Sequence, residues 1–438
     1  MLCVRFTLLR RLNALNSCLN PFSTKTSFDW SSLKSNSLLA SDYHEYDYWL
    51  NDKNFNEIVH NLETRRKPNF DTLANQCRAD GCVSTVLEKH LHLMPNKLNE
   101  KWQNYTLEQI ANFTAKDLTV KVFGTRKKFD FRTKTAEHLL KKFGSFFDYS
   151  NGDIGLYGGE RAYVLVGDGA LLQNAIINWA LDELRNTFEF TLISVPHIVN
   201  EEIVAACGFN PKGERTQIHK LRGIHENVED LPCLIGTSEI PLAAFHIGHT
   251  FEVDELPKKY CCVSRCYRSE TDQSDGLYRV QYFTKVEMFA LTEKGKSAEM
   301  LQHFINVQEY LFSQLGLLCR LIDMPPHELG RPANRKFDIE AWIPSKRICG
   351  EISSASDCTD YQSRRFNIKY RKIEPDYERN EPFTTEYVST VNGTAVALPR
   401  LLIPLIEYNQ TKEKKVILPQ VLHPYMEGKS VLEMNDSQ

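Results

Sequence analysis

Charged, polar and aromatic residues between Cys266 and Glu287 are suited to binding a nucleotide. Arg268 presents a planar fork of donors that can pair with phosphate, and the carboxylate of Glu270 can accept a hydrogen bond from the amino group of a base. A short polar loop follows, and the chain returns through an aromatic, β-rich run in which Phe283 can stack on the base. The pattern predicts two adjacent strands that together hold a nucleotide.

The order Arg-x-Glu, polar loop, GLYRV and FTKVE resembles motif 2 of class II aminoacyl-tRNA synthetases, and its details are similar to the seryl enzymes of animal mitochondria. Four further segments resemble family motifs and occur in the family's order. They are a TxE loop at Gly236–Glu239, an active-site strand at Arg335–Trp342, an ExSS segment at Gly350–Arg365 and motif 3 at Val391–Arg400. Taken singly, each charged residue is more simply a surface ion pair; five blocks in one order favour the synthetase resemblance.

The resemblance implies a serine site beside an ATP site. In the family the TxE loop captures the amino group of the amino acid, the glutamate that ends motif 2 faces serine, and the motif 3 threonine faces the serine hydroxyl. The implied serine-binding residues are Thr237, Ser238, Glu239, Glu287 and Thr394. The implied ATP-binding residues are Arg268, Ser269, Glu270, Phe283, Glu351, Ile352, Ser353, Ser354 and Arg400, with Glu351 and Ser354 also holding Mg²⁺.

The implied activity is that of a serine–tRNA ligase. Serine attacks the α-phosphorus of ATP to form seryl-adenylate and pyrophosphate, and a terminal ribose hydroxyl of tRNA(Ser) then takes the seryl group. Arg268 and Arg400 are the expected catalytic residues, because they would stabilise charge at the α-phosphate and at the leaving pyrophosphate. A site that bonds the serine hydroxyl rejects alanine, because alanine leaves buried polar groups unpaired.

Three departures from the family pattern all concern tRNA handling. The motif 2 loop has only five residues, Thr271–Asp275; Gln281 and Tyr282 stand where the family carries histidine followed by histidine or glutamine; and no long coiled-coil arm is evident before residue 119. We therefore expect another subunit, or the basic segments 126–134 and 364–372, to hold the tRNA. The alternative is a catalytically inactive synthetase-like subunit that binds tRNA or a synthetase partner.

The elements that must position these residues belong to an α+β fold, in which an antiparallel sheet is flanked by helices. We expect residues 29–118 to form a reduced helical region and 119–438 the catalytic domain. Segment 178–210 resembles motif 1, which builds the family's dimer interface, so a homodimer or a heterodimer with a synthetase-like subunit is expected. Strands are predicted at 188–195, 260–267, 277–291 and 337–342, and helices at 170–184, 297–315 and 401–409. Residues 42–115 are predicted to be weakly helical, in short pieces at 55–66 and 71–93, because Pro68 and Gly81 interrupt the pattern.

Two short motifs do not fit that organisation. His246–His249 spells the HIGH tetrapeptide of class I synthetases, but it lies mid-chain and without that class's glycine context. Gly295-Lys296-Ser297 is not a P-loop, because Ala290 stands where the first glycine would be required. Neither motif carries a functional prediction.

The first 28 residues contain four cationic residues and no acidic one, and they place leucines on one helical face. This composition predicts a mitochondrial transit peptide, with a frayed basic terminus as the alternative, and hence a protein of the mitochondrial matrix. The formal net charge of −3 argues against non-specific nucleic-acid binding through bulk charge. No apolar run approaches the ~20 residues of a membrane helix, so no membrane association is expected. The twelve cysteines lack paired metal spacing and are expected to be reduced thiols.

Overall fold

The computed structural model describes residues 46–148, 158–159, 161–211, 218–222, 231–269, 276–372 and 384–434. All of them belong to one compact unit, Asp42–Gln438. The predicted transit peptide, the ATP-binding candidate Glu270 and the loop Thr271–Asp275 lie outside the described residues. Within the described residues, no helix is long and apolar enough to cross a membrane.

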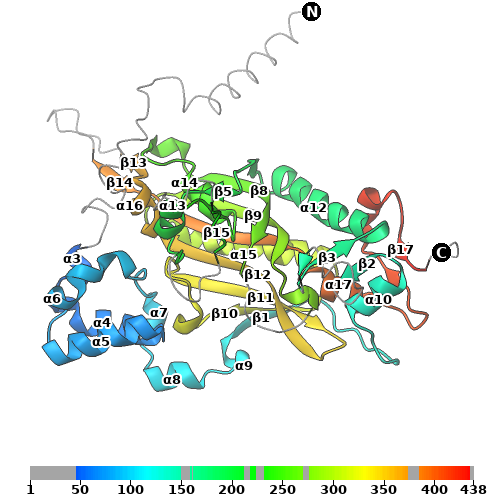
Figure 1. The fold of residues 1–438 in the computed structure, drawn as a ribbon, viewed down its shortest axis with the longest axis horizontal. Coiled ribbons are helices and arrows are strands. Elements are labelled where there is room, and N and C mark those ends of the chain that lie inside the picture. Colours follow the sequence, from blue (N-terminus) through cyan, green and yellow to red (C-terminus); the bar gives the residue numbers. More distant parts are fainter. Residues whose placement is uncertain are drawn as a thin grey trace, which may run out of the picture. The chain divides into compact units, whose positions relative to one another are not determined.

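An eight-stranded sheet forms the centre of the fold, in the order β1-β10-β11-β12-β15-β9-β8-β4 (Figure 1). Seven strands are antiparallel to their neighbours, and β4 joins the edge in parallel with β8. The predicted α+β class and antiparallel sheet are therefore confirmed. The strands are β1 (Thr119–Phe123), β4 (Thr191–Leu192), β8 (Lys258–Tyr267), β9 (Tyr282–Thr292), β10 (Cys319–Asp323), β11 (Arg335–Ile343), β12 (Ile348–Thr359) and β15 (Ser389–Ala397).

The two faces of strand β9 have different surroundings, because side chains alternate along a strand. Val286, Met288 and Ala290 point into the main hydrophobic core, beneath helix α15 (Ser297–Gln314). Lys285 and Glu287, which alternate with these residues, point to the opposite face and line a cavity. The sheet thus has one apolar face that packs on α15. The opposite face is polar at Lys285 and Glu287, where the candidate site lies, and apolar at Phe289 and Leu291, which belong to a second hydrophobic cluster.

Further helices surround this sheet. Helix α12 packs against β8, β9, β15 and the short helix η8, and α17 packs against β11 and α10. Their bounds are α10 (Ala136–Lys142), α12 (Asp168–Asn186), α13 (Glu201–Ala206), α14 (Glu239–Ala244), α16 (Tyr361–Phe366), α17 (Leu402–Tyr408) and η8 (Gln420–Met426). Smaller sheets are β14 (Thr385–Tyr387), β13 (Lys369–Arg371) and β7 (Thr250–Glu252); β2 (Phe146–Asp148) with β3 (Tyr163–Leu165); β5 (Ile198–Val199) with β6 (Cys233–Leu234); and β16 (Val416–Ile417) with β17 (Val431–Leu432).

The described N-terminal region is a set of short helices with its own apolar cluster. Its longest helix, α5 (Pro68–Asp80), has 13 residues and spans about 20 Å, so within the described chain no long arm projects. Arg65, at the end of α4 (Phe55–Thr64), is buried and donates to the carbonyls of Gly330 at 2.8 Å and Ala333 at 3.0 Å. These bonds tie the region to a loop beside the candidate site. The remaining helices are α3 (Tyr46–Trp49), α6 (Ser84–Leu87), α7 (Glu100–Gln103), α8 (Leu107–Asn112) and α9 (Ala115–Leu118).

Several predicted elements differ from those observed. The strand predicted over 277–291 begins only at Tyr282, because Gly276–Tyr278 forms the 3₁₀ turn η6. The strand predicted over 188–195 shrinks to β4, since Glu189 adopts a φ of +59°. The interruption predicted at Gly81 is confirmed, because its φ of +65° ends α5, whereas Pro68, predicted as a second interruption, begins that helix. The helices predicted over 170–184, 297–315 and 401–409 and the strands over 260–267 and 337–342 are confirmed, with ends that move by up to two residues.

One of the two basic segments is only partly exposed, contrary to the prediction. Arg364 and Arg365 are buried: Arg364 forms an ion pair with Asp360 at 3.1 Å, and Arg365 lies 3.5 Å from the ring centroid of Tyr361. The prediction that segment 364–372 offers a surface patch is therefore wrong for Arg364 and Arg365, whereas Arg371 and Lys372 are exposed. Burial on helix α16 uses both guanidinium groups to satisfy local acceptors.

Candidate active site

A cavity of about 350 Å³ opens on the polar face of the central sheet. Its floor comes from β9, β12 and β15, and the start of α14 and the turn η6 supply further walls. A loop that contains Glu328 and Arg331 closes another side. The cavity brings together candidate residues that the sequence separates by more than 150 positions, and its lining includes Thr237, Glu239, Arg268, Phe283, Glu287, Glu351, Ile352, Ser353, Ser354, Thr394 and Arg400.

Glu239 supplies a buried carboxylate at one end of this cavity. It is only 7% exposed, and its Oε1 accepts from Gln362 Nε2 at 2.7 Å and from Asn392 Nδ2 at 3.0 Å. Burial, together with the negative charge of Glu287, raises the pKa of Glu239 to about 7. The carboxyl is therefore partly protonated near neutral pH, and a cationic ligand such as an ammonium group would favour its ionised form.

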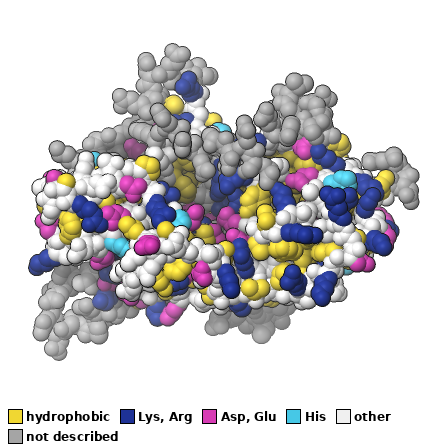
Figure 2. Space-filling model, turned by 90° about the horizontal axis from the view of Figure 1, so that it is seen from below, with side chains coloured by type: hydrophobic (Ala, Val, Ile, Leu, Met, Phe, Trp, Pro, Cys, Tyr) yellow, Lys and Arg dark blue, Asp and Glu magenta, His cyan; other side chains and the backbone are white. Residues whose placement is uncertain are grey.

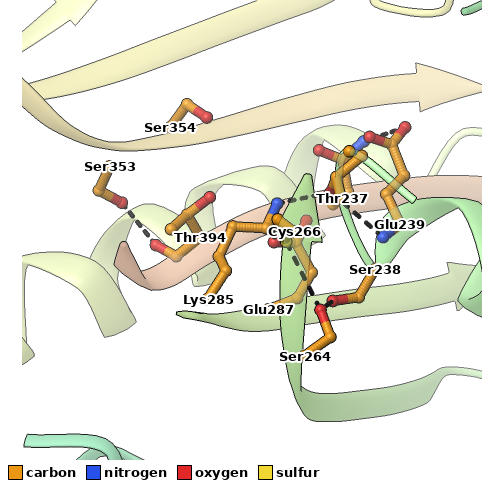
Figure 3. Close-up of polar contacts among 12 residues, drawn as sticks. Thr237, Ser238, Glu239, Ser264, Cys266, Lys285, Glu287, Ser353, Ser354 and Thr394 are labelled. Carbon is orange, nitrogen blue, oxygen red and sulfur yellow. Dashed lines mark hydrogen bonds and ion pairs between the residues drawn. The ribbon is translucent and has the colours of Figure 1, made fainter. Parts of the chain in front are cut away.

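Glu287 and Thr394 lie next to each other at the same end, because they are direct cross-strand partners in the β9–β15 ladder. Such pairs place their Cβ atoms about 5 Å apart. Lys285 forms an ion pair with Glu287 and donates to Thr237 Oγ1 at 2.5 Å, and Figure 3 shows these side chains converging from neighbouring elements. Burial raises the pKa of Glu287, and the Lys285 charge opposes that rise. This end is a compact set of charged and hydroxyl groups around a small volume.

The other end of the cavity is rich in arginine. Arg268 donates through Nε to the Gly236 carbonyl at 3.2 Å, and its guanidinium carbon lies 5.2 Å from the ring centroid of Phe283. Arg400 Nη1 donates to Glu351 Oε2 at 2.9 Å. Both arginines line the cavity, and each guanidinium has five N–H donors, so this end can bind an anionic ligand.

Glu351 is ionised although it is partly buried. The positive charges of Lys336, Arg400 and Arg268 outweigh the desolvation of its carboxyl, and they lower its pKa. The Tyr278 hydroxyl donates to the Glu351 backbone carbonyl at 3.2 Å, which holds η6 against β12. Glu351 is thus a fixed anionic oxygen donor beside Ser354 on the cavity wall.

Not every predicted site residue reaches the cavity. Within the described chain, Ser238 and Ser269 do not line it, and the Ser238 hydroxyl pairs instead with that of Ser264 at 2.5 Å (Figure 3). Ser353 lines the cavity, while its hydroxyl donates to the Thr394 carbonyl at 2.5 Å. Ser238 and Ser353 therefore fix the loop and the strand that carry Glu239 and Thr394.

Sequence reasoning missed four residues that shape the site. Lys285 and Asn392 line the cavity, and Gln362 orients Glu239. The Arg400 guanidinium carbon lies 4.9 Å from the ring centroid of Tyr278. A signal was available for Lys285, because strand alternation places residues 283, 285 and 287 on one face. Gln362 had no such signal, since it reaches Glu239 from helix α16.

Comparison with known proteins gives the family. Residues 220–409 match the model of the tRNA synthetase class II core domain (G, H, P, S and T). The serine–tRNA ligase of Dictyoglomus thermophilum is 34% identical over 350 residues, which cover 78% of this chain and 76% of that protein. This chain belongs to the serine–tRNA ligase family. The predicted family membership is thereby confirmed.

Three other members of the serine–tRNA ligase family are similar to this chain in sequence or in structure. The mitochondrial serine–tRNA ligase of Mus musculus is 42% identical over 273 residues, which cover 61% of this chain; the chain spans about half the length of that relative. The cytoplasmic serine–tRNA ligase of Naegleria fowleri, solved with AMP, has 28% identity and a TM-score of 0.65 over 84% of this chain and 74% of that one. The Pyrococcus horikoshii seryl-tRNA synthetase, solved with ATP, shares the fold with a TM-score of 0.70 at 24% identity, over 89% of this chain and 91% of that one.

Proposed function

We propose that this chain is a serine–tRNA ligase of mitochondria, which activates serine with ATP and transfers it to tRNA(Ser). One observation carries the proposal: Glu287 and Thr394 are cross-strand partners next to the buried carboxylate of Glu239, in a cavity that also holds Arg268 and Arg400. A small amino acid with a hydroxyl group needs polar partners at both ends. The cavity supplies them together with phosphate-binding cations.

The residues take distinct roles in the proposed activation of serine. The ammonium group of serine would bind Glu239, whose ionised form it favours, and the hydroxyl would bind between Glu287 and Thr394. The adenine ring would stack on Phe283. The serine carboxylate then attacks the α-phosphorus, where Arg268 stabilises the charge that builds up, and Arg400 stabilises the pyrophosphate that leaves.

The donor set fits a divalent cation bound together with ATP. Mg²⁺ prefers oxygen ligands and is commonly held by one or two carboxylates together with phosphates of the substrate. Glu351, kept ionised by nearby cations, and the Ser354 hydroxyl offer such oxygens on one wall. When bound, Mg²⁺ would neutralise charge on the phosphates. Arg400 must then share Glu351, to which it is bonded here at 2.9 Å.

Partners and location are proposed from the relatives and from the surface. Relatives from mouse, cattle and yeast are mitochondrial serine–tRNA ligases, which supports a mitochondrial location, in the matrix, with residues 1–28 as the transit peptide. The large apolar residues Leu192 and Ile198 are 46% and 52% exposed within the motif 1 segment. This surface supports a dimer, with a second copy or with a synthetase-like subunit. We propose residues 29–118 as a reduced tRNA-arm region and 119–438 as the catalytic domain.

A second candidate function is an inactive synthetase-like subunit that binds tRNA or a synthetase partner. The observation that favours it is the packing of Tyr282 against Tyr163. Tyr282 is one of the two residues before Phe283 that depart from the family pattern. Tyr282 stacks on Tyr163 with ring centroids 5.7 Å apart and donates its hydroxyl to the Tyr163 carbonyl at 3.1 Å. This position serves packing, so the change beside the nucleotide site is a fixed structural feature.

Serine-dependent exchange of pyrophosphate into ATP separates the two candidates, because it needs no tRNA. The ligase proposal expects exchange with the purified chain, and a loss of about 10² to 10³ in rate for Arg268→Ala, which removes a transition-state donor. Lys116→Ala, in helix α9 and outside the cavity lining, is the matched control. A folded protein without exchange that still binds tRNA or a synthetase subunit would reject the ligase and establish the inactive subunit.

A further inference from the structure

A second cavity, of about 1060 Å³, lies between the segment that follows β1 and the turn that joins β11 to β12. We name it the basic groove. Its walls combine cations and aromatic rings, chiefly Arg126, Lys128, Arg132 and Arg347 with Phe131 and Trp342. Figure 2 shows Lys and Arg side chains gathered toward the right of the face seen from below, with hydrophobic side chains between them. Among the described residues, the basic groove and the candidate active site share no lining residue.

The charge of the basic groove is not balanced locally. Residues 126–135 contain five cationic residues and one acidic residue, Asp130. Within the described part of the chain, none of Arg126, Lys128, Arg132 and Arg347 takes part in an ion pair. All four are exposed, although the protein as a whole carries a net charge of −3. Such a patch on an acidic protein favours a polyanionic ligand.

The backbone of this segment is held in place. Lys127 N donates to the Tyr408 hydroxyl at 2.7 Å, Lys127 Nζ donates to Asn409 Oδ1 at 2.7 Å, and Lys134 N donates to Gln410 Oε1 at 2.7 Å. These contacts attach both ends of the segment to the end of helix α17. The unpaired cations therefore extend from a fixed base, which lowers the entropy cost of binding.

Two aromatic rings distinguish the basic groove from a simple phosphate site. Phe131 lies edge-on to Phe129, with ring centroids 5.5 Å apart, and it is only half-buried and outside the hydrophobic core clusters. Trp342 is also half-buried on the opposite wall. Base stacking on such rings, combined with cations along the backbone, is how single-stranded nucleic acid is bound without sequence preference.

The groove lies beside the active site along the chain. Arg347 precedes β12, and Glu351 of the active-site cavity is four residues further, a span of about 13 Å in an extended strand. On the other side, Glu137 of α10 accepts from Leu277 N at 3.3 Å, which joins the groove segment to the turn η6. A chain bound in the groove would thus run close to Tyr278 and Arg400.

We propose that the basic groove binds the sugar–phosphate backbone of RNA, with an unpaired base stacked on Phe131. Resting on the proposed function, the RNA is tRNA next to its acceptor end. The groove would supply contacts that the five-residue motif 2 loop and the reduced N-terminal region do not. Arg126, Lys128, Arg132 and Arg347 bind phosphates, and Phe131 and Trp342 bind the base.

The test measures binding of a fluorescent tRNA(Ser) transcript to the full chain across a range of salt concentrations. Lys128→Glu/Arg132→Glu is expected to weaken binding at least about tenfold and to lower the slope of log K against log[salt] by about 2, since two phosphate contacts are lost. The matched control is Lys116→Glu/Lys294→Glu, which makes the same charge change near the opposite ends of strands β1 and β9. Equal weakening by both variants, or unchanged binding by the groove variant, would overturn the proposal.

Further measurements test base stacking on Phe131 and distinguish RNA from other polyanions. Phe131→Ala should weaken binding to the transcript more than to the same transcript whose acceptor end is paired with a complementary oligonucleotide; equal effects would refute the stacking role. Polyglutamate and anionic lipid vesicles should compete less well than unlabelled tRNA. If either competes equally well, the groove is a general polyanion site and the proposal of RNA binding is rejected. Serine-dependent exchange should be unchanged in the groove variant. If the parent chain shows no exchange but its RNA binding still depends on the groove, the ligase proposal fails and the groove stands.

Discussion

Replacing the buried carboxylate of Glu239 should stabilise the protein at high pH while destroying the proposed serine site. The pKa of Glu239 is about 7 in the folded protein and 4.5 in an unperturbed glutamate. Between these values the folded state binds more protons than the unfolded state, so stability falls as the pH rises through this window. At pH 8 the ionised group costs about 3 kcal/mol, from a shift of about 2.5 units at 1.36 kcal/mol each.

Glu239→Gln removes this cost, because the amide is neutral and keeps an oxygen that accepts from Gln362 and Asn392. We expect the variant to gain about 3 kcal/mol in the free energy of unfolding at pH 8 and almost nothing at pH 4.5. For a protein of about 400 residues this corresponds to roughly 4 °C in melting temperature. Serine-dependent exchange should be lost in the same variant, since the ammonium group has no anionic partner.

The assay is a series of melting curves between pH 4.5 and 8.5 for the parent, Glu239→Gln and the control Glu299→Gln. Glu299 lies on the exposed side of α15, with a side chain 76% exposed, so its substitution should give a small, pH-independent shift. A melting-temperature difference for Glu239→Gln that does not grow with pH would refute the reasoning. So would destabilisation of that variant at pH 8.

Three other substitutions test the scaffold and the site. Arg65→Leu leaves buried carbonyls without donors and should cost about 3 to 5 kcal/mol in urea unfolding; a loss below about 1 kcal/mol would contradict the anchoring role. Gly124→Ala should cost about 2 to 3 kcal/mol, because φ is +87° and the new Cβ would lie 1.9 Å from the Leu317 carbonyl oxygen; an unchanged melting temperature would show that the turn relaxes. Gln362→Ala should raise the KM for serine about tenfold in the exchange assay with little change in kcat, since Glu239 loses one donor; an effect on kcat alone would reject this positioning role.

The sequence by itself predicted the parts of the site that lie close together along the chain. Arg268, Phe283 and Glu287 follow one another across a turn and a strand, so their types and spacing indicate a common face. The same local logic predicted α15 and β8 closely, because their hydrophobic periodicity is long and regular. Family membership also followed from motif order alone.

The tertiary structure decided what depends on contacts between distant segments. Gln362 orients Glu239 from 123 positions away, and Arg364 is buried although its sequence reads as a basic surface. Strand pairing sets Thr394 directly opposite Glu287, a register that no local pattern specifies. The basic groove likewise exists because the β11–β12 turn lies opposite the segment after β1. Charge and burial at such sites arise from packing between elements, and residue type alone does not determine them.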